Sequence, residues 1–355
     1  MILTMAASQQ NRIAWISSLR GLMIGTSEGE WRLRASDSAG INANNAEFER
    51  HSGVGSSLLD ALTVENSLLF VQQGGRKVRE FFYSLEADGF LTRDVSLLSD
   101  HLLTEGIVDW TVQRSTAFHV WCILKDGSAV CMTLNREQNI VAWHAHLLEH
   151  GRILSVASLR SSQDTQDEEV WFTVERGEGE HACITVERMA EGNEYLDACT
   201  EAVVRDGRLS GLRHLAGCEA VLMDGNGSCS TILVDGEGNA PCPERREGET
   251  VRAGMAAPAE VRTMPLESLE TLGRLKKQLG ARALLHESSL QFLYGTGAPG
   301  AWRRFQPGRY GAEAPYSGYV RLTHNYGTDE QAAFALRVEE PGPFNLLALV
   351  LDVEL

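Results

Sequence analysis

The sequence predicts an all-β fold with two domains. A partial or atypical β-propeller-like domain with few blades is expected over residues 1–240. A smaller, mostly-β, sandwich-like domain with one short helix is expected over residues 241–355. Two observations carry this prediction. Short apolar runs separated by glycine-containing turns fill residues 11–235, which is typical of an all-β chain, and the composition changes near residue 235.

The apolar runs of the first domain are rich in aromatic and β-branched residues, which favour strands. Examples are RIAWISSL, SLLFVQQ, FHVWCILKDG and EVWFTVERG. No long amphipathic helix interrupts them. The segment VSLLSDHLLTEGI, residues 95–107, is the best candidate for a short helix.

Aromatic residues recur along these strands at a nearly constant interval. Trp15, Phe70, Trp121 and Trp171 are separated by 55, 51 and 50 residues. One four-stranded propeller blade occupies about 40 to 50 residues, which is close to this interval, although the residues between do not align into a clean repeat. Closed rings typically have about 4 to 8 blades, and four sheets are few for such a ring.

The dipeptide Asp126-Gly127, flanked by strand-forming residues, predicts a two-residue hairpin turn. Pairing Lys125 with Ser128 then places Cys122 opposite Cys131, as a pair whose side chains approach closely. Two states are open for these residues: a cross-strand disulfide or two reduced thiols. A reducing compartment favours the thiols.

A second hairpin is predicted around Gly74-Gly75, with Phe70 opposite Arg79. The strand after the turn begins with the basic residues Arg76 and Lys77, which raises the question of a phosphate-binding loop. Such loops lead from a strand into a helix N-terminus. These glycines lead instead into the aromatic run FFY, so we expect a hairpin, in which Arg79 stacks on Phe70 or pairs with a carboxylate.

The second domain is expected to begin after the segment DGEGNAPCPERREGET, which resembles a linker in its glycines, prolines and mixed charges. The next segment, PLESLETLGRLKK, places Leu266, Leu269, Leu272 and Leu275 at helical spacing. Strand-like runs then resume, from ARALLHESSLQFLYG to FNLLALVLDVEL.

Composition excludes several classes of function. The chain of 355 residues carries a net charge of −16, which disfavours general affinity for a phosphate backbone. No stretch approaches the roughly 18 to 20 apolar residues that span a bilayer, and the N-terminus lacks the basic start of a signal peptide. Seven cysteines without CxxC spacing argue against a zinc ribbon and a secreted disulfide framework.

We predict no catalytic, cofactor-binding or metal-binding residue and no cofactor. The densest candidate is the group His144, His146 and His150. Residues 144 and 146 share one face of a strand, but no carboxylate or cysteine follows at a matching spacing. Packing or surface roles are therefore expected for these histidines. The sequence contains no GxSxG elbow, P-loop or GxGxxG motif opening a helix.

Several motifs, taken in order, resemble the tail nozzle proteins of phages, also called tail tubular protein B. The segment LLFVQQGGRKVREFFYSLEADGF resembles the family's run from an FVQ strand through paired glycines to an RxVRE strand. The segment VWCILKDGSAVCMTLNREQNIVAWHAH is similar to its segment with REQ and AWH. DEEVWFTVER and LSGLRHLAGCEAVLMDG resemble the segments that follow. The C-terminal AAFALRVEEPGPFNLLALVLDVEL is similar to the family's closing segment, although Glu339, Glu340 and Phe344 depart from it.

The resemblance covers the chain from about residue 11 and implies a structural protein of a phage or prophage tail, without enzymatic activity. It implies a homo-oligomeric ring around the DNA exit channel, with other tail and portal-adaptor proteins as partners and DNA only as passing cargo. Its location would be the virion tail, and the host bacterial cytoplasm during assembly, with no membrane insertion. Family members typically carry a further N-terminal region, so the chain resembles their C-terminal portion.

Two other functions compete with this one. The first is a propeller-type carbohydrate-binding module or hydrolase, which a cleft lined by carboxylates would favour. The second is nucleic-acid binding through Arg76, Lys77 and Arg79, which predicts salt-dependent binding of DNA.

Overall fold

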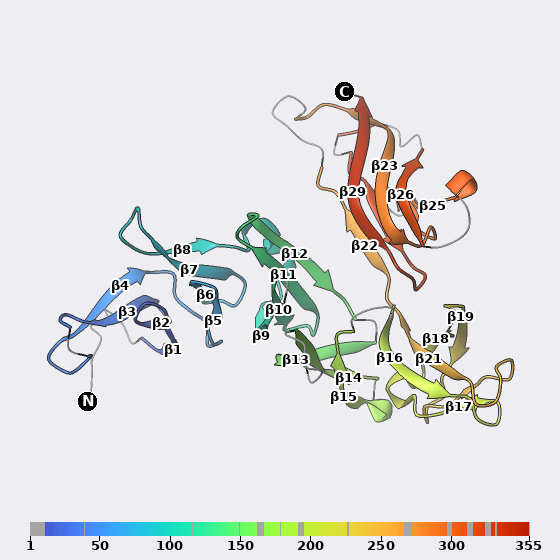
Figure 1. Ribbon diagram of the computed structural model, residues 1–355, viewed down its shortest axis with the longest axis horizontal. Coiled ribbons are helices and arrows are strands. Elements are labelled where there is room, and N and C mark those ends of the chain that lie inside the picture. The colour runs from blue at the N-terminus through green and yellow to red at the C-terminus, as the bar shows by residue number, and fades with distance from the viewer. Residues whose placement is uncertain are drawn as a thin grey trace. The chain divides into compact units, whose positions relative to one another are not determined.

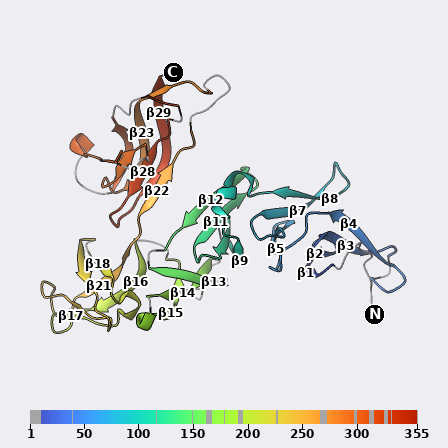
Figure 2. The same cartoon turned by 180° about the vertical axis from the view of Figure 1, so that it is seen from behind.

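The computed structural model describes residues 11–38, 40–115, 117–148, 150–161, 167–177, 179–190, 195–225, 227–265, 272–296, 300–310, 315–323, 328–330 and 332–354. The described chain is built almost entirely of antiparallel strands, which confirms the predicted all-β class (Figures 1 and 2). It divides into two compact units. Unit 1 contains Met1–Arg176 and Ala182–Met189, and unit 2 contains Gly177–His181 and Ala190–Leu355.

Unit 1 consists of four antiparallel sheets that follow one another along the chain. The first is formed by β1 (Ile13–Ser18), β2 (Leu22–Thr26), β3 (Gly29–Ala35) and β4 (Ala46–Ser52). The second is formed by β5 (Leu62–Val64), β6 (Ser67–Val71), β7 (Val78–Ser84) and β8 (Gly89–Asp94). The third is formed by β9 (Ile107–Arg114), β10 (Phe118–Leu124), β11 (Ala129–Asn135) and β12 (Ile140–His146). The fourth is formed by β13 (Gly151–Arg160), β14 (Glu168–Arg176) and β15 (Cys183–Arg188).

The interval between aromatic residues corresponds to this succession of sheets. Trp15 lies in β1, Phe70 in β6, Trp121 in β10 and Trp171 in β14, so each sheet contains one of them. Successive sheets share buried cores. Trp15 and Phe70 belong to the core between the first two sheets, and Trp121 belongs to the core between the third and fourth. Each described sheet is therefore buried chiefly against its neighbours in the sequence.

The hairpin at Gly74-Gly75 has the predicted register. Phe70 pairs with Arg79, and Val71 pairs with Val78. The turn is longer than two residues. The carbonyl of Gln72 accepts a hydrogen bond from the N–H of Gly75, and the N–H of Gln72 donates to the carbonyl of Lys77. Both glycines have a positive φ, of 97° and 78°, a conformation that glycine adopts without steric cost.

The predicted register of the hairpin at Asp126-Gly127 is wrong by one residue. The N–H of Leu124 donates to the carbonyl of Ser128, and the N–H of Gly127 donates to the carbonyl of Leu124, so the loop has three residues. Cys122 consequently pairs with Val130, and Cys131 pairs with Trp121. The two cysteines face opposite cores, and both are free thiols. An Asp-Gly pair favours a two-residue turn, but a type I turn followed by glycine is the next commonest solution.

The helix expected in residues 95–107 is a 3₁₀ helix, η1 (Leu97–Leu102). Its side chains are not buried, whereas Leu103, directly after it, is fully buried in the core between the second and third sheets. The segment is therefore a short helical connection between β8 and β9, with one anchoring residue.

Unit 2 begins with a sheet in which the strand order differs from the sequence order. Its strands run β16 (Leu196–Val203), β21 (Thr250–Ala256), β18 (Glu219–Met223) and β19 (Cys229–Leu233). A two-stranded sheet of β17 (Arg208–Leu209) and β20 (Ala240–Pro241) accompanies it. Because β21 pairs with both β16 and β18, this sheet extends across residue 240, where the sequence predicted a domain boundary.

The rest of unit 2 consists of two sheets that share one core, the arrangement of a β-sandwich. One sheet contains β22 (Ala259–Arg262), β28 (Ala335–Val338), β24 (Leu293–Gly295) and β25 (Arg303–Arg304). The other contains β26 (Tyr316–Leu322), β23 (Lys276–Ser288), β27 (Thr328–Asp329) and β29 (Asn345–Glu354). The remaining 3₁₀ turns are η2 (Gly179–His181), η3 (Arg213–Leu215) and η4 (Gly308–Tyr310).

The helix predicted from the leucine spacing falls largely on residues outside the described ranges, which exclude Leu266 and Leu269. Leu272 and Leu275 are described, are exposed and precede β23 without helical structure. Within the described residues, no helix is long and apolar enough to cross a membrane.

Candidate functional site

Two of the three basic residues of the hairpin at Gly74-Gly75 contact neighbouring side chains. Lys77 Nζ lies 3.1 Å from the carboxylate of Asp94. Arg79 Nε donates a hydrogen bond of 2.9 Å to the side-chain oxygen of Gln72, although Phe70 is its partner in the register. Arg76 is exposed. These three side chains therefore do not converge on a common anion site.

The next residue of the same strand, Glu80, is the centre of an ionic cluster. Its side chain is fully buried, and a buried carboxylate needs compensating partners. Arg93 Nε donates to one carboxylate oxygen at 2.6 Å, and Arg136 Nη2 contacts the other. Arg136 also lies 3.9 Å from Glu65. We call these four residues the inter-sheet ionic cluster, because Arg136 follows β11 of the third sheet and the other three belong to the second.

The cluster joins two segments that are far apart in the sequence. Glu80 ends the sequence RKVRE, and Arg136 lies in NREQ. Trp143 contributes a further contact between the same sheets. Its Nε1 donates a hydrogen bond of 3.0 Å to the carbonyl of Val95. The polar atoms of these motifs are thus used to join successive sheets.

Backbone hydrogen bonds repeat this connection at the hairpin turns. The carbonyl of Gly75, in the turn between β6 and β7, accepts from the N–H of Ile107 at 2.8 Å. The carbonyl of Gly127, in the turn between β10 and β11, accepts from the N–H of Ile153, also at 2.8 Å. In each pair the turn of one sheet contacts an early residue of the first strand of the next sheet. We call these two contacts the turn joints.

Close approach explains the glycine at the second turn joint. A Cβ atom on Gly127 would lie 2.3 Å from the Cβ of Arg152, which is far inside van der Waals contact. The φ of Gly127 is 90°, so both the conformation and the available space select glycine. The turn at Asp126-Gly127 therefore also serves the contact between the third and fourth sheets.

The two histidines of β12 share one face, as predicted. His144 pairs with Cys131 and His146 pairs with Ala129, and both partners line the core between the third and fourth sheets. The two imidazole rings are 4.8 Å apart, and the ring of His146 lies 4.8 Å from that of Trp121. Burial lowers the pKa of both histidines, that of His146 to about 4.

The described residues contain no group of three or more potential metal ligands, and His150 is exposed. His144 is exposed and His146 is partly buried against Trp121, so the two histidines form the rim of the core between the third and fourth sheets.

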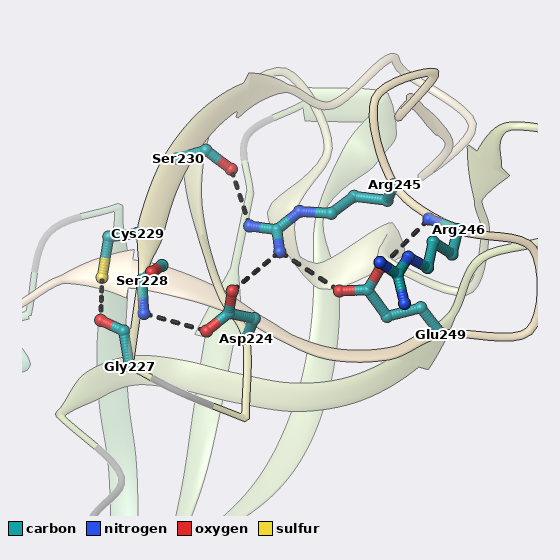
Figure 3. Close-up of polar contacts among 8 residues, drawn as sticks. All are labelled: Asp224, Gly227, Ser228, Cys229, Ser230, Arg245, Arg246 and Glu249. Carbon is teal, nitrogen blue, oxygen red and sulfur yellow. Dashed lines mark hydrogen bonds and ion pairs between the residues drawn. The ribbon is translucent and has the colours of Figure 1, made fainter.

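A further polar cluster lies in unit 2 around Arg245 (Figure 3). The guanidinium of Arg245 donates a hydrogen bond of 3.1 Å to the carboxylate of Asp224 and another of 3.1 Å to that of Glu249. It also donates to the hydroxyl of Ser230 at 3.4 Å. Glu249 also accepts from the N–H of Arg246 at 3.0 Å. Hydrogen bonds from these carboxylates raise the pKa of Arg245, so the side chain is a charged clamp between the loop after β20 and the β18–β19 hairpin.

Asp224 also shapes its own turn. Its carboxylate accepts from the N–H of Ser228 at 2.9 Å (Figure 3). The second Asp-Gly sequence of this region is built in the same way, because Asp235 accepts from the N–H groups of Glu237 and Asn239. Both aspartates therefore have structural partners within their turns, where aspartate side chains commonly bond the backbone a few residues further on.

No protein-family model matches the chain, and no curated protein matches it.

The basic residues Arg76, Lys77 and Arg79 directly precede Glu80 or lie close to it in the sequence. The burial of Glu80 depends on the position of Arg136, which is 56 residues away in the sequence and belongs to another sheet. The sequence contains one signal: Glu80 shares a strand face with Val78 and Phe82, and an acidic residue among apolar residues of a buried strand face usually has a cation as partner.

Proposed function

We propose that the chain is an architectural protein of a phage or prophage tail, of the nozzle type, which acts by assembling around the DNA exit channel. The observation that supports this most is the contact between Glu80 and Arg136. Both residues belong to the motifs that resemble the nozzle family. Their use in a contact between two sheets is consistent with a structural role for these motifs.

The state of Glu80 supports an architectural role over a chemical one. A general acid or base exchanges protons with a substrate and needs an accessible oxygen. Glu80 is fully buried, and each of its carboxylate oxygens contacts an arginine. Two adjacent guanidinium groups hold a carboxylate in its ionised form, which suits a permanent ion pair.

The charge of the chain supports passage of DNA without retention. A net charge of −16 repels a phosphate backbone at long range. The basic side chains Lys77, Arg93 and Arg136 are used in contacts with carboxylates. Little of this positive charge is therefore available to the phosphates of a passing duplex.

Electron microscopy of the purified full chain, combined with a solution mass measurement, tests the proposal. We expect uniform rings whose mass is a fixed multiple of the chain mass. A strictly monomeric protein would contradict it. A binding assay with duplex DNA at low salt is the second arm, and we expect no binding. Salt-dependent binding that is lost on Arg76→Ala would instead favour the nucleic-acid function.

A further inference from the structure

The strand β29 forms an edge of the C-terminal sandwich. Its ten residues pair with β23 on one side, and the two strands run side by side in both views (Figures 1 and 2). Within the described parts of the chain, no strand pairs with the opposite edge of β29. Such an edge presents a row of backbone donors and acceptors to which a further strand can bind.

Over most of its length this edge lacks proline and lysine, which often protect an edge strand, and its one bulge is confined to Leu347. The sequence NLLALVLDVE has six leucine or valine residues among its ten, with no proline and no lysine. Leu347 is 62% exposed and Val350 is 39% exposed. A register shift places a bulge at Leu347, so the regular part of the strand follows it. Protected edges normally carry lysine, proline or inward-pointing charge.

The two acidic residues of β29 are compensated within the same chain. Asp352 lies 3.5 Å from Arg282, and Glu354 lies 3.9 Å from Lys277, both on β23. These pairs reduce the repulsion that a second strand would meet. Charged residues of other edge strands also have partners within the chain: Glu47 of β4 lies 3.2 Å from Arg34, and Glu187 of β15 lies 2.7 Å from Arg176.

We propose that β29 pairs in antiparallel orientation with β29 of a second copy of this chain, so that the two sheets continue into one another across a two-fold axis. The distribution of charge selects this orientation. Both carboxylates lie in the second half of the strand, and the first half, Asn345–Leu349, is uncharged. Antiparallel pairing places each acidic half against the uncharged half of the copy, whereas parallel pairing would align like charges.

A second copy suits this edge because an interface on a two-fold axis uses the same surface twice. The edge of β29 can therefore pair with the same edge of a second copy, and no other surface of the chain is needed for the contact. The pairing does not depend on the tail role proposed above, since it concerns contacts between two chains and not their cargo.

Sedimentation velocity of the full chain over a concentration series tests this pairing. We expect association of two copies whose extent rises with concentration, as free dimers or as a pairing of the rings proposed above. Val350→Glu should weaken dimerisation at least tenfold, because it adds a third carboxylate to the edge. The new side chain would face Arg282 in the register of β23, so the monomer should keep its thermal midpoint.

The matched control is Val186→Glu on β15, where the valine is 69% exposed on another edge strand. This variant should dimerise like the wild type. Wild-type protein that stays monomeric at every concentration would overturn the pairing. So would a Val350→Glu variant with unchanged dimerisation, or equal weakening by Val186→Glu or by Val141→Glu on β12.

Hydrogen exchange of the wild-type protein gives an independent reading that needs no variant. Peptides from residues 345–354 should exchange more slowly as the concentration rises, and peptides from β15 should not change. Exchange of residues 345–354 that is independent of concentration would overturn the pairing even if a dimer forms by another surface. Rings without protection of β29 would support the tail proposal and contradict this one.

Discussion

Arg136, which follows the third strand of the third sheet, contacts the buried carboxylate of Glu80 in the third strand of the second sheet. The sequence separates these residues by 56 positions. Arg93 binds the other oxygen of the same carboxylate. The buried carboxylate of Glu80 therefore has two cationic partners: Arg93 from its own sheet and Arg136 from the next sheet.

Removal of Arg136 should be much more costly than removal of an exposed arginine. Arg136→Met leaves Glu80 with only the half-exposed Arg93 as partner, and breaking a buried pair in this way costs about 3 to 5 kcal/mol. Urea unfolding measures the loss. Arg34→Met is the matched control, because the pair of Arg34 with Glu47 is half-exposed on both sides and should contribute less than about 1 kcal/mol. Equal losses in the two variants would show that the inter-sheet ionic cluster has no special role.

Acid should destabilise the packing of the third sheet against the fourth. The folded protein holds the pKa of His146 at about 4, below its unfolded value of 6.5. Between these two pH values the unfolded chain binds more protons than the folded protein. The contribution of the neutral His146 to the free energy of unfolding is therefore fully present above pH 6.5 and is lost as the pH decreases towards 4. His146→Leu should reduce the dependence of stability on pH between pH 4 and 6.5, as measured by thermal unfolding at a series of pH values. His150→Leu, which replaces an exposed histidine, is the control, and equal slopes for wild type and His146→Leu would contradict the expectation.

Cys122 and Cys131 should remain unreactive thiols in the folded protein. Burial raises the pKa of both, that of Cys131 to about 12, and the thiolate is the reactive form. Alkylation followed by peptide mass spectrometry should label the exposed Cys229 first. The two buried cysteines should be labelled only on unfolding. A disulfide-linked peptide containing both would contradict the register, because their side chains face opposite cores.

Local patterns predicted the strands well. The aromatic interval located one strand in each sheet of unit 1, and the pairing of Phe70 with Arg79 followed from the glycine turn. These features depend on residues close in sequence. The error at Asp126-Gly127 is also local: one additional loop residue shifts the register by one and moves Cys131 to the other face of the sheet.

Features that depend on distant residues could not be predicted. Glu80 and Arg136 each appear as ordinary charged residues of a strand and a loop, and only the packing of two sheets brings them together. The same holds for β21, whose pairing with β16 crosses the expected domain boundary. A composition change marks flexible or polar loops, but it does not indicate which strands pair across them.

The turn joints have a consequence for how unit 1 can change during evolution. Gly75 and Gly127 form the same hydrogen bond to the next sheet, and the shared cores lie between sheets adjacent in sequence. Stability in such an array is a sum over nearest neighbours. A duplication or deletion of one whole sheet with its turn would therefore keep the same kind of contact between the sheets that become neighbours. We expect lineages of this protein to differ by multiples of about 50 residues, the length of one repeat.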